Sequence, residues 1–465
     1  MTDEDPLILD FRNGWVPEGA DLDEYYLGGL DDELSNWDDI DLEDAFDLPP
    51  VLPPVRLPEE AELAAQARQS TLLADLRALA DEVRKTTVQT AAVNPVLLWL
   101  AREAELVEGD GEELTPGEDA GWLDDLADDS HAMNAWEYTF AEVLDTTLEA
   151  ADDSDPVVDH ELDLGGHGPA LVTRLFLSRR EGVRITELAG AIKEAATVEL
   201  AEEEAAGQWQ EWVDAHGDPL RLLLGQLERL GAVSVTGDTA RLEPLGVQAV
   251  RSKLESDGLF VPVLPAPDKM TPDDLVLVFM QGSDEDLEAE LASWTDPRGE
   301  EQAARELLSF AADRNAATRT AAVTIVAKLG QTAEPAWREA LDHAELRCYA
   351  KRQLAKLAGL DPEGTDLPAE LQPRRADVAW LIADAFGPFS HFDLGKERFP
   401  FDFADLQRVS GFEKPDEVFE AIARLDHPDA EAVLAMIGRH ASDKTTAKAA
   451  RRAAYKASTR RAARR

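Results

Sequence analysis

The side chains that could do chemistry are numerous in this sequence, but their spacing matches no catalytic motif. The eight histidines include no His-Glu-x-x-His arrangement, which would place two zinc ligands on one helix face. A phosphate-binding loop needs Ser or Thr after its Gly-Lys pair, whereas Glu397 follows Gly395 and Lys396. The glycine-rich segment 164–170 lacks the spacing of a dinucleotide-binding turn. We therefore expect no enzyme activity, no catalytic residue and no cofactor.

The residue types that ligate metals are also poorly arranged for that purpose. The aspartates between Asp38 and Asp47 lack the glycine and the final glutamate of a calcium-binding loop. The one cysteine, Cys348, excludes a disulfide framework and a four-thiolate zinc site, and its apolar helical surroundings predict a buried, inert thiol. Four histidines fall at the ends of predicted helices, where we expect caps or surface groups: His131, His216, His343 and His427. The sequence thus predicts no metal site.

The distribution of charge limits the partners of the chain. The 465 residues carry a formal net charge of −50 at pH 7. Residues 1–170 hold 45 acidic and 7 basic side chains, whereas residues 441–465 hold one acidic and nine basic side chains. The overall negative charge repels phosphate and argues against a general nucleic-acid-coating protein. No apolar stretch reaches the roughly 18 residues that span a bilayer, and the acidic N-terminus differs from a signal peptide, so we expect a cytoplasmic protein.

Residues 1–58 form an acidic extension in which carboxylates alternate with large apolar side chains. Such a segment buries too little apolar surface to fold alone, and the proline run that ends at Pro58 predicts a stiff, extended linker. Two hypotheses fit this composition: a solvated tether that packs on its own body, or a docking segment for a protein with a basic surface. The candidate docking residues are Phe11, Trp15, Tyr25, Tyr26, Trp37 and Phe46.

Residues 59–151 show a helical period that leads into a hairpin. Apolar residues recur at three- and four-residue steps from Glu59 to about Arg84, and further helices are predicted for Asn94–Glu105 and Ala132–Leu148. Residues 106–116 predict two short strands and a turn. We expect a domain boundary in the loop-like segment 152–168.

Residues 169–262 repeat this order more clearly. Helices are predicted for Leu171–Ser178, from Ile185 with Thr186 as its cap, and for Asp218–Leu230, and a hairpin follows over residues 233–242. The stretch LERLGAVSVTGDTARLEPLG resembles the recognition helix and wing of bacterial winged-helix regulators.

The two regions contain an internal sequence repeat. Leu100, Arg102, Ala104, Leu106, Leu114 and Pro116 align with Leu227, Arg229, Gly231, Val233, Leu242 and Pro244, with one residue inserted in the second turn. We therefore predict a winged-helix domain at 169–262 and a degenerate winged-helix-like unit at 59–151.

A winged helix that reads DNA needs basic side chains on its third helix and wing. The second unit offers Arg221, Arg229 and Arg241 as candidate nucleic-acid contacts. Acidic residues accompany these arginines: Asp218, Glu228, Asp238 and Glu243. The wing of the first unit is more acidic still, with Glu108, Asp110, Glu112 and Glu113 where a phosphate would lie, so we expect no ordinary DNA docking there.

Residues 269–460 predict a run of short amphipathic helices. The expected helices are Pro272–Met280, Asp284–Trp294, Glu300–Asp313, Ala316–Leu329, Ala333–Asp342, Leu346–Leu360, Asp377–Phe386, Pro415–Leu425, Asp429–His440 and Lys444–Thr459. Two segments resemble HEAT repeats, which are stacked helix pairs: RNAATRTAAVTIVAKLGQTAEPAWREALDHAELRCYAKRQLAKLAG and DHPDAEAVLAMIGRHASDKTTAKAARRAAYKAST. This resemblance implies HEAT-like repeats at 269–360 and 415–465, joined by an irregular connection at 361–414. The expected fold class is mainly α: winged-helix-like units, then a HEAT-like α-solenoid, after an acidic extension.

The basic C-terminal segment is expected to form the last repeat helix, with its alanines packed inward. Nine bases exceed what a helix end needs, so nucleic acid is a candidate partner there. The candidate contacts are Lys448, Arg451, Arg452, Lys456, Arg460, Arg461, Arg464 and Arg465. The acidic extension competes for the same charges, since it is tethered to them.

In its order of units, the chain resembles a family of actinobacterial proteins that combine winged-helix units with helical repeats, a resemblance that implies architecture and no activity. Three function classes stay open. The first is a protein-interaction scaffold or regulatory factor, with a partner that has a basic surface. The second is a nucleic-acid-associated regulator, and the enzyme nearest to this class is a HEAT-like DNA glycosylase, which requires a basic groove. The third is an acidic mimic of nucleic acid.

Overall fold

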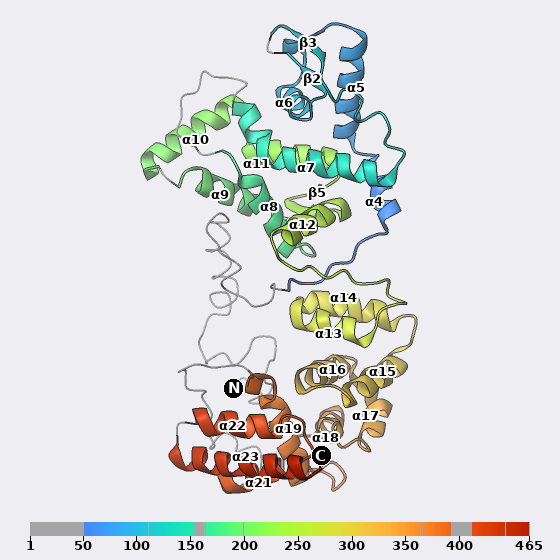
Figure 1. The fold of residues 1–465 in the computed structure, drawn as a ribbon, viewed down its shortest axis with the longest axis vertical. Helices are drawn as coiled ribbons and strands as arrows, with labels where there is room; N and C mark the ends of the chain where they lie inside the picture. The colour runs from blue at the N-terminus through green and yellow to red at the C-terminus, as the bar shows by residue number, and fades with distance from the viewer. Residues whose placement is uncertain are drawn as a thin grey trace. The chain divides into compact units, whose positions relative to one another are not determined.

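The computed structural model describes residues 51–109, 111–152, 162, 164–198, 200–362, 364, 366–391, 412–441 and 443–464. These residues are mainly helical, as predicted, and they divide into two compact units that meet in sequence between Leu264 and Pro265 (Figure 1). Every helix in this part of the chain is too short or too polar to cross a membrane. The candidate docking residues between Phe11 and Phe46 lie outside the described residues.

The first unit begins with a helix-and-hairpin module. It contains α4 (Glu60–Ala67), α5 (Thr71–Lys85), β1 (Val88–Gln89), η1 (Thr90–Ala92), α6 (Pro95–Glu103), β2 (Val107–Glu108) and β3 (Glu113–Pro116). The strands form an antiparallel sheet in the order β1-β3-β2. The single helix predicted from Glu59 to Arg84 is two helices, because the Ser70 side chain accepts the Leu73 N–H at 3.2 Å and starts a new one.

A second module in the same unit has the same arrangement of three strands, but two α-helices, rather than one 3-10 turn, lie between its first strand and the helix before its hairpin. It contains α8 (His167–Leu177), β4 (Val183–Arg184), α9 (Ile185–Ala196), α10 (Glu202–His216), α11 (Pro219–Leu230), β5 (Val233–Thr236), β6 (Thr239–Leu242) and α12 (Pro244–Ser256). Its sheet order is β4-β6-β5, and the predicted hairpin is confirmed. Thr186 does not cap α9, since that helix begins at Ile185 and Thr186 lies in its first turn.

The backbone geometry repeats between the modules with one constant shift along the sequence. Val107 pairs with Pro116 as Val233 pairs with Leu242. After α6 the Leu106 N–H donates to the Ala101 carbonyl, and after α11 the Ala232 N–H donates to the Leu227 carbonyl, both at 2.9 Å. The residues at these two helix ends, Glu105 and Gly231, both have positive φ.

The structural repeat corrects the alignment of the internal sequence repeat. The shift that carries Val107 to Val233 also carries Glu113 to Thr239, so neither turn has an inserted residue. The sequence alignment of the two modules is shifted by one or two residues because it pairs leucines with each other. The structurally equivalent residues are instead defined by the helix end and by the strand register.

The two modules share one hydrophobic core rather than two separate ones. The long helix α7 (Asp129–Asp152) packs against α4 and α6 of the first module and against α8 and α11 of the second. Residues 51–55 are extended, as predicted for the linker, but they belong to this unit. Val51 and Val55 form parallel bridges with Phe260 and Val263, and Val55 is buried.

The second unit, from Pro265 onward, is built of short packed helices. They are α13 (Pro272–Gln281), α14 (Asp284–Thr295), α15 (Glu300–Ala312), α16 (Ala316–Lys328), η2 (Gly330–Ala333), α17 (Glu334–Ala340), α18 (Arg347–Leu357), α19 (Arg375–Phe386), η3 (Pro388–His391), α21 (Pro415–Arg424), α22 (Ala430–His440) and α23 (Lys444–Arg464). Each predicted helix is present, with ends shifted by a few residues. The aromatic-rich segment 387–403 is described only as far as His391.

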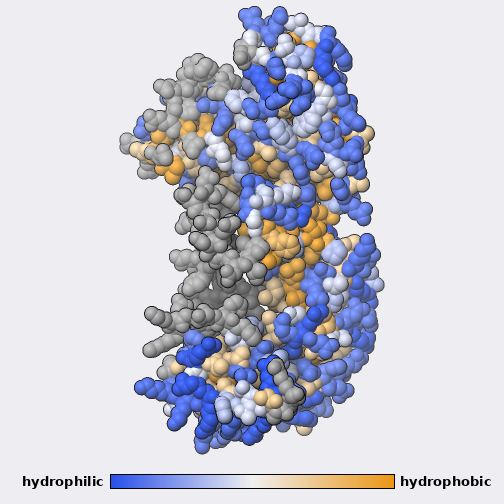
Figure 2. Space-filling view, viewed as in Figure 1, coloured by the Kyte–Doolittle hydropathy of each residue, from blue (hydrophilic) through white to orange (hydrophobic). Residues whose placement is uncertain are grey.

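Several helices of this unit, among them α13, α14 and α16, begin after a residue whose side chain accepts a backbone N–H of the first turn. Thr271 and Ser283 each form a capping box with an aspartate three residues later. Apolar stripes turn inward, so that Leu307, Ala322 and Ile325 are buried. Figure 2 shows hydrophilic surface over the outer side of α15 and α17. Each of these helices therefore turns its apolar face toward the core of the unit and its polar face toward solvent.

Candidate functional site

The helix predicted to read DNA, α11, is packed on more than one side. It contacts α9 and β5 of its own module, and it also contacts α5 and α7. The buried Trp136 indole of α7 donates to the Leu230 carbonyl at 2.8 Å, and the hydroxyls of Ser70 and Thr71 donate to the Arg229 carbonyl. The end of α11 is therefore held by the first module.

The three candidate DNA contacts of this module are largely engaged within the chain. The Arg229 guanidinium donates to the Asp75 carboxylate and to the Gln226 amide oxygen, each at 2.6 Å. Arg241 Nε donates to the Glu181 carbonyl at 3.1 Å. Arg221 is exposed, and its guanidinium has no hydrogen-bond or ion-pair partner among the described residues. One arginine is too little charge to hold a duplex.

The first module presents carboxylates instead of bases. Glu112 and Glu113 are exposed on the hairpin that corresponds to β5–β6. Beside α6, the pKa of the Glu142 carboxyl is raised by partial burial and by the neighbouring charges of Glu103 and Asp145. The pKa of the Tyr138 hydroxyl is also raised, first by burial and then by nearby carboxylates. This surface disfavours a further anion.

The basic C-terminal segment is a packed helix, with the alanine face turned inward as predicted. α23 contacts α21 and α22 along its length. The alanines of its inner face are buried: Ala449, Ala450, Ala453 and Ala457. The small side chains let the helices approach closely, and a Cβ added at Gly438 of α22 would lie 2.6 Å from the Arg451 side chain.

Four bases of α23 have partners inside this helical unit. Arg452 and Lys456 pair with Asp416 and Glu420 of α21 at 2.9 and 2.6 Å. Arg451 donates to the Gly438 carbonyl at 2.6 Å, and Arg460 donates to the Ala423 carbonyl at 3.0 Å. The two carbonyl contacts, made by Arg451 and Arg460, place positive charge at the C-terminal ends of α22 and α21, where helix dipoles favour it.

The Lys456 ammonium changes the titration of its partner. It lowers the pKa of the Glu420 carboxyl, with smaller contributions from Arg424 and Arg452. The candidates Lys448 and Arg461 are exposed and have no hydrogen-bond or ion-pair partner in the described part of the chain. The side chains of Arg464 and Arg465 lie outside the described residues. The structure thus divides the basic candidates into helix-packing residues and solvent-facing ones.

A small pocket lies where α23 passes the turn between α21 and α22. Its volume is about 260 Å³. Its charged lining includes both signs, with Arg460 and Arg461 on one helix and Asp426 and Glu431 near the start of α22. Because these charges offset each other, the pocket favours neither an anion nor a cation.

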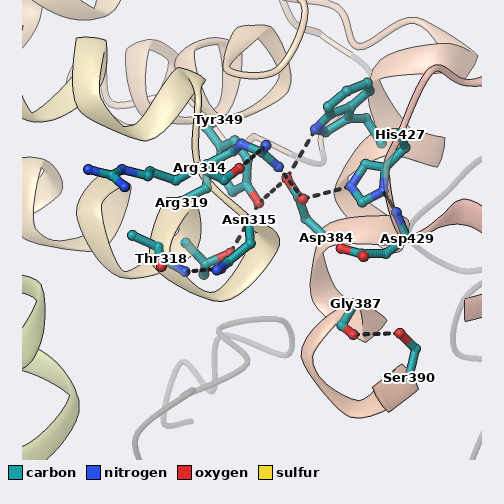
Figure 3. A network of polar contacts seen from close by, with 12 residues as sticks. Arg314, Asn315, Thr318, Arg319, Tyr349, Asp384, Gly387, Ser390, His427 and Asp429 are labelled. Carbon is teal, nitrogen blue, oxygen red and sulfur yellow. Dashed lines mark hydrogen bonds and ion pairs between the residues drawn. The ribbon is translucent and has the colours of Figure 1, made fainter. Parts of the chain in front are cut away.

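A buried polar network lies next to this turn, centred on the carboxylate of Asp384 in α19 (Figure 3). Asp384 is 0% exposed. Its Oδ2 accepts from the Tyr349 hydroxyl and from the Trp380 indole, both at 3.0 Å. Its Oδ1 accepts from the Arg319 guanidinium and from His427 Nε2, the latter at 2.8 Å. All four acceptor positions of the carboxylate are therefore used.

The Asp384 network, formed by Arg319, Tyr349, Trp380, Asp384 and His427, joins α16, α18, α19 and the turn before α22. His427 Nδ1 accepts the Asp429 N–H at 3.1 Å, so the ring proton lies on Nε2 and points to Asp384. Arg319 also lies over the Trp380 ring, 5.6 Å from its centroid. Burial raises the pKa of the Tyr349 hydroxyl well above its usual value. Arg319 Nε is buried without a hydrogen-bond partner among the described residues, whereas the carboxylate at the centre of the network is fully bonded and holds these helices in one arrangement.

Sequence reasoning missed this network. His427 was expected to be a cap or surface group, but its side chain is 0% exposed. The side chain of His216 is also buried, with Nε2 3.9 Å from Asp152, whereas His343 is exposed. A charged residue inside an apolar helical segment, such as Asp384 in WLIADAF, is the sequence feature that could have indicated a buried polar network.

A second buried ion pair lies nearby in the same helical unit. Lys351 Nζ is 2.7 Å from the Asp377 carboxylate and also donates to the Gln372 carbonyl at 3.0 Å. The Asp377 carboxylate also accepts the Arg374 N–H, which starts α19. Cys348 is buried, as predicted, and burial raises the pKa of its thiol. The buried Cys348 thiol therefore contributes to core packing.

No group of three or more His, Cys, Asp or Glu side chains arranged to hold a metal occurs among the residues described. Comparison with known proteins gives no further guide, because no family model, no curated protein and no solved structure matches the chain.

Proposed function

We propose that the chain is a non-enzymatic interaction scaffold for other proteins, built from two winged-helix-like modules and a HEAT-like helical array. The order helix, strand, helices and hairpin in each module, with its central third strand, supports the winged-helix interpretation. Paired antiparallel helices with inward alanine and leucine stripes support the repeat interpretation.

One observation carries the choice of a protein-interaction role over DNA reading. The helix that precedes the hairpin of the second module, α11, contacts α5 and α7, and its Arg229 is paired with Asp75. A winged helix that enters the major groove must leave this helix open to the duplex. Here its second side is used to hold the preceding module.

Chromatography of the full chain on heparin at low salt tests the proposal. We expect the chain to flow through, because its net charge is −50 and, of the two α11 arginines, only Arg221 has a guanidinium without a bonding partner in the described structure. The variant Arg221→Ala should behave identically, as should the control Lys85→Ala on α5.

Retention on heparin that is lost in Arg221→Ala, but kept in Lys85→Ala, would overturn the proposal and favour a nucleic-acid-associated regulator. The acidic-mimic hypothesis makes a different prediction, since the chain would then displace duplex DNA from a basic partner protein. That outcome would also contradict a role limited to scaffolding.

A further inference from the structure

The side of α23 that faces solvent is a basic strip with an aromatic residue at its centre. Its residues, which we call the outer face of α23, are all exposed: Lys444, Lys448, Arg451, Arg452, Tyr455 and Lys456. Tyr455 is 75% exposed, an unusual position for an aromatic ring on a packed helix. Helical spacing places Arg452 one turn away and Lys448 two turns away on the same side of α23, opposite the alanine face.

The outer face keeps positive charge after its internal contacts are made. Asp416 and Glu420 offset Arg452 and Lys456. Lys444 and Lys448 have no partner among the residues that the structure describes. No acidic residue occurs within α23 to offset them. The face is therefore suited to carboxylates, which it already binds at Asp416 and Glu420.

The chain itself contains the complementary segment. Residues 1–50 carry 17 acidic side chains and one basic residue, Arg12, together with six tryptophan, tyrosine and phenylalanine residues. Tethering gives such a segment an effective concentration of about a millimolar, which a free partner rarely reaches. A nucleic acid that approached the same lysines and arginines would be repelled by the chain's net charge of −50.

We propose that residues 1–50 dock on the outer face of α23 of the same chain, with carboxylates at Lys444 and Lys448 and an aromatic ring against Tyr455. This intramolecular contact covers the one basic surface of α23 and keeps it from other anions. The proposal does not depend on which proteins the scaffold binds.

Zero-length carbodiimide cross-linking of the full chain tests this contact. The reagent activates a carboxylate, a lysine amine displaces the activating group, and one amide bond remains for detection by mass spectrometry. We expect amides between Lys444 or Lys448 and carboxylates of residues 1–50, lost at high salt because the contact is electrostatic. Tyr455→Ala and Arg452→Glu, which keep both lysines, should lower their yield severalfold, whereas the control Lys85→Glu should not.

Three outcomes would overturn the proposal. The first is that neither Lys444 nor Lys448 forms an amide while other lysines do. The second is that the amides of these two lysines join only carboxylates outside residues 1–50. The third is that, in a mixture of isotope-labelled and unlabelled chains, the amides join different chains, which would identify a second copy as the occupant.

Duplex binding gives a second, independent readout in the full chain. Changing Asp31, Asp32, Glu33, Asp38 and Asp39 to their amides should expose the outer face of α23. We expect the affinity for a random duplex at about 50 mM salt to rise about tenfold or more, and to fall steeply with added salt. Equal affinity of the variant and the unmodified chain would contradict masking by residues 1–50.

Discussion

Replacing Asp384 with asparagine is expected to destabilise the helical unit by about 3–5 kcal/mol. The substitution removes the charge that offsets Arg319, whose side chain is 3% exposed. It also turns one acceptor oxygen into an NH₂ group that faces hydrogen-bond donors, since Tyr349, Trp380 and His427 all donate to the carboxylate. Urea denaturation followed by circular dichroism measures the loss.

Asp284→Asn is the matched control for this substitution. Asp284 also pairs with a base, Lys328, at 3.1 Å, but its side chain is 64% exposed. An exposed pair contributes about 0–1 kcal/mol, so the control should unfold close to the unmodified chain. An Asp384→Asn variant within about 1 kcal/mol of the unmodified chain would show that the network does not hold α16, α18 and α19 together.

Replacing Trp136 with alanine should cost about 3–5 kcal/mol in the first unit. The Trp136 ring is 0% exposed and stacks on Phe140 with centroids 5.2 Å apart. Its indole also holds the C-terminal end of α11 through the Leu230 carbonyl. The loss therefore combines a large cavity with an unpaired carbonyl at the junction of the two modules.

Two variants of the same helix separate these contributions. Trp136→Phe keeps most of the ring but removes the indole N–H, so it should cost less than alanine. Tyr138→Ala removes a ring that is 38% exposed on the other side of α7, and it should cost least. If Trp136→Ala were no more destabilising than Tyr138→Ala, α7 would not join the modules in the way described.

Much of the fold could be predicted from local sequence patterns. The helices of residues 269–460 were located from apolar stripes of period 3.6 separated by turns at near-regular spacing. The hairpin at 233–242 followed from alternating side chains around a glycine turn. Helix ends were less accurate, and the break at Ser70 was missed because the apolar period runs through it.

The buried networks could not be predicted in this way. Arg319 and His427 lie 65 and 43 residues from Asp384 in the sequence, and only the packing of separate helices brings them together. The partners of α11 could not be predicted for the same reason, because they are distant in the sequence. Its arginines resembled a reading surface in the sequence, yet Asp75, which pairs with Arg229, lies 154 residues away.

Hydrogen exchange of the α11 amides in the full chain tests the central claim most directly, because a helix held on both sides opens only with its neighbours. We predict that residues 220–230 exchange as slowly as the buried amides of α7, and that adding duplex DNA at about 50 mM salt leaves their rates unchanged. Fast exchange of α11 while α7 stays protected, or new protection of α11 on adding DNA, would contradict the claim that α11 is an internal contact rather than a reading helix.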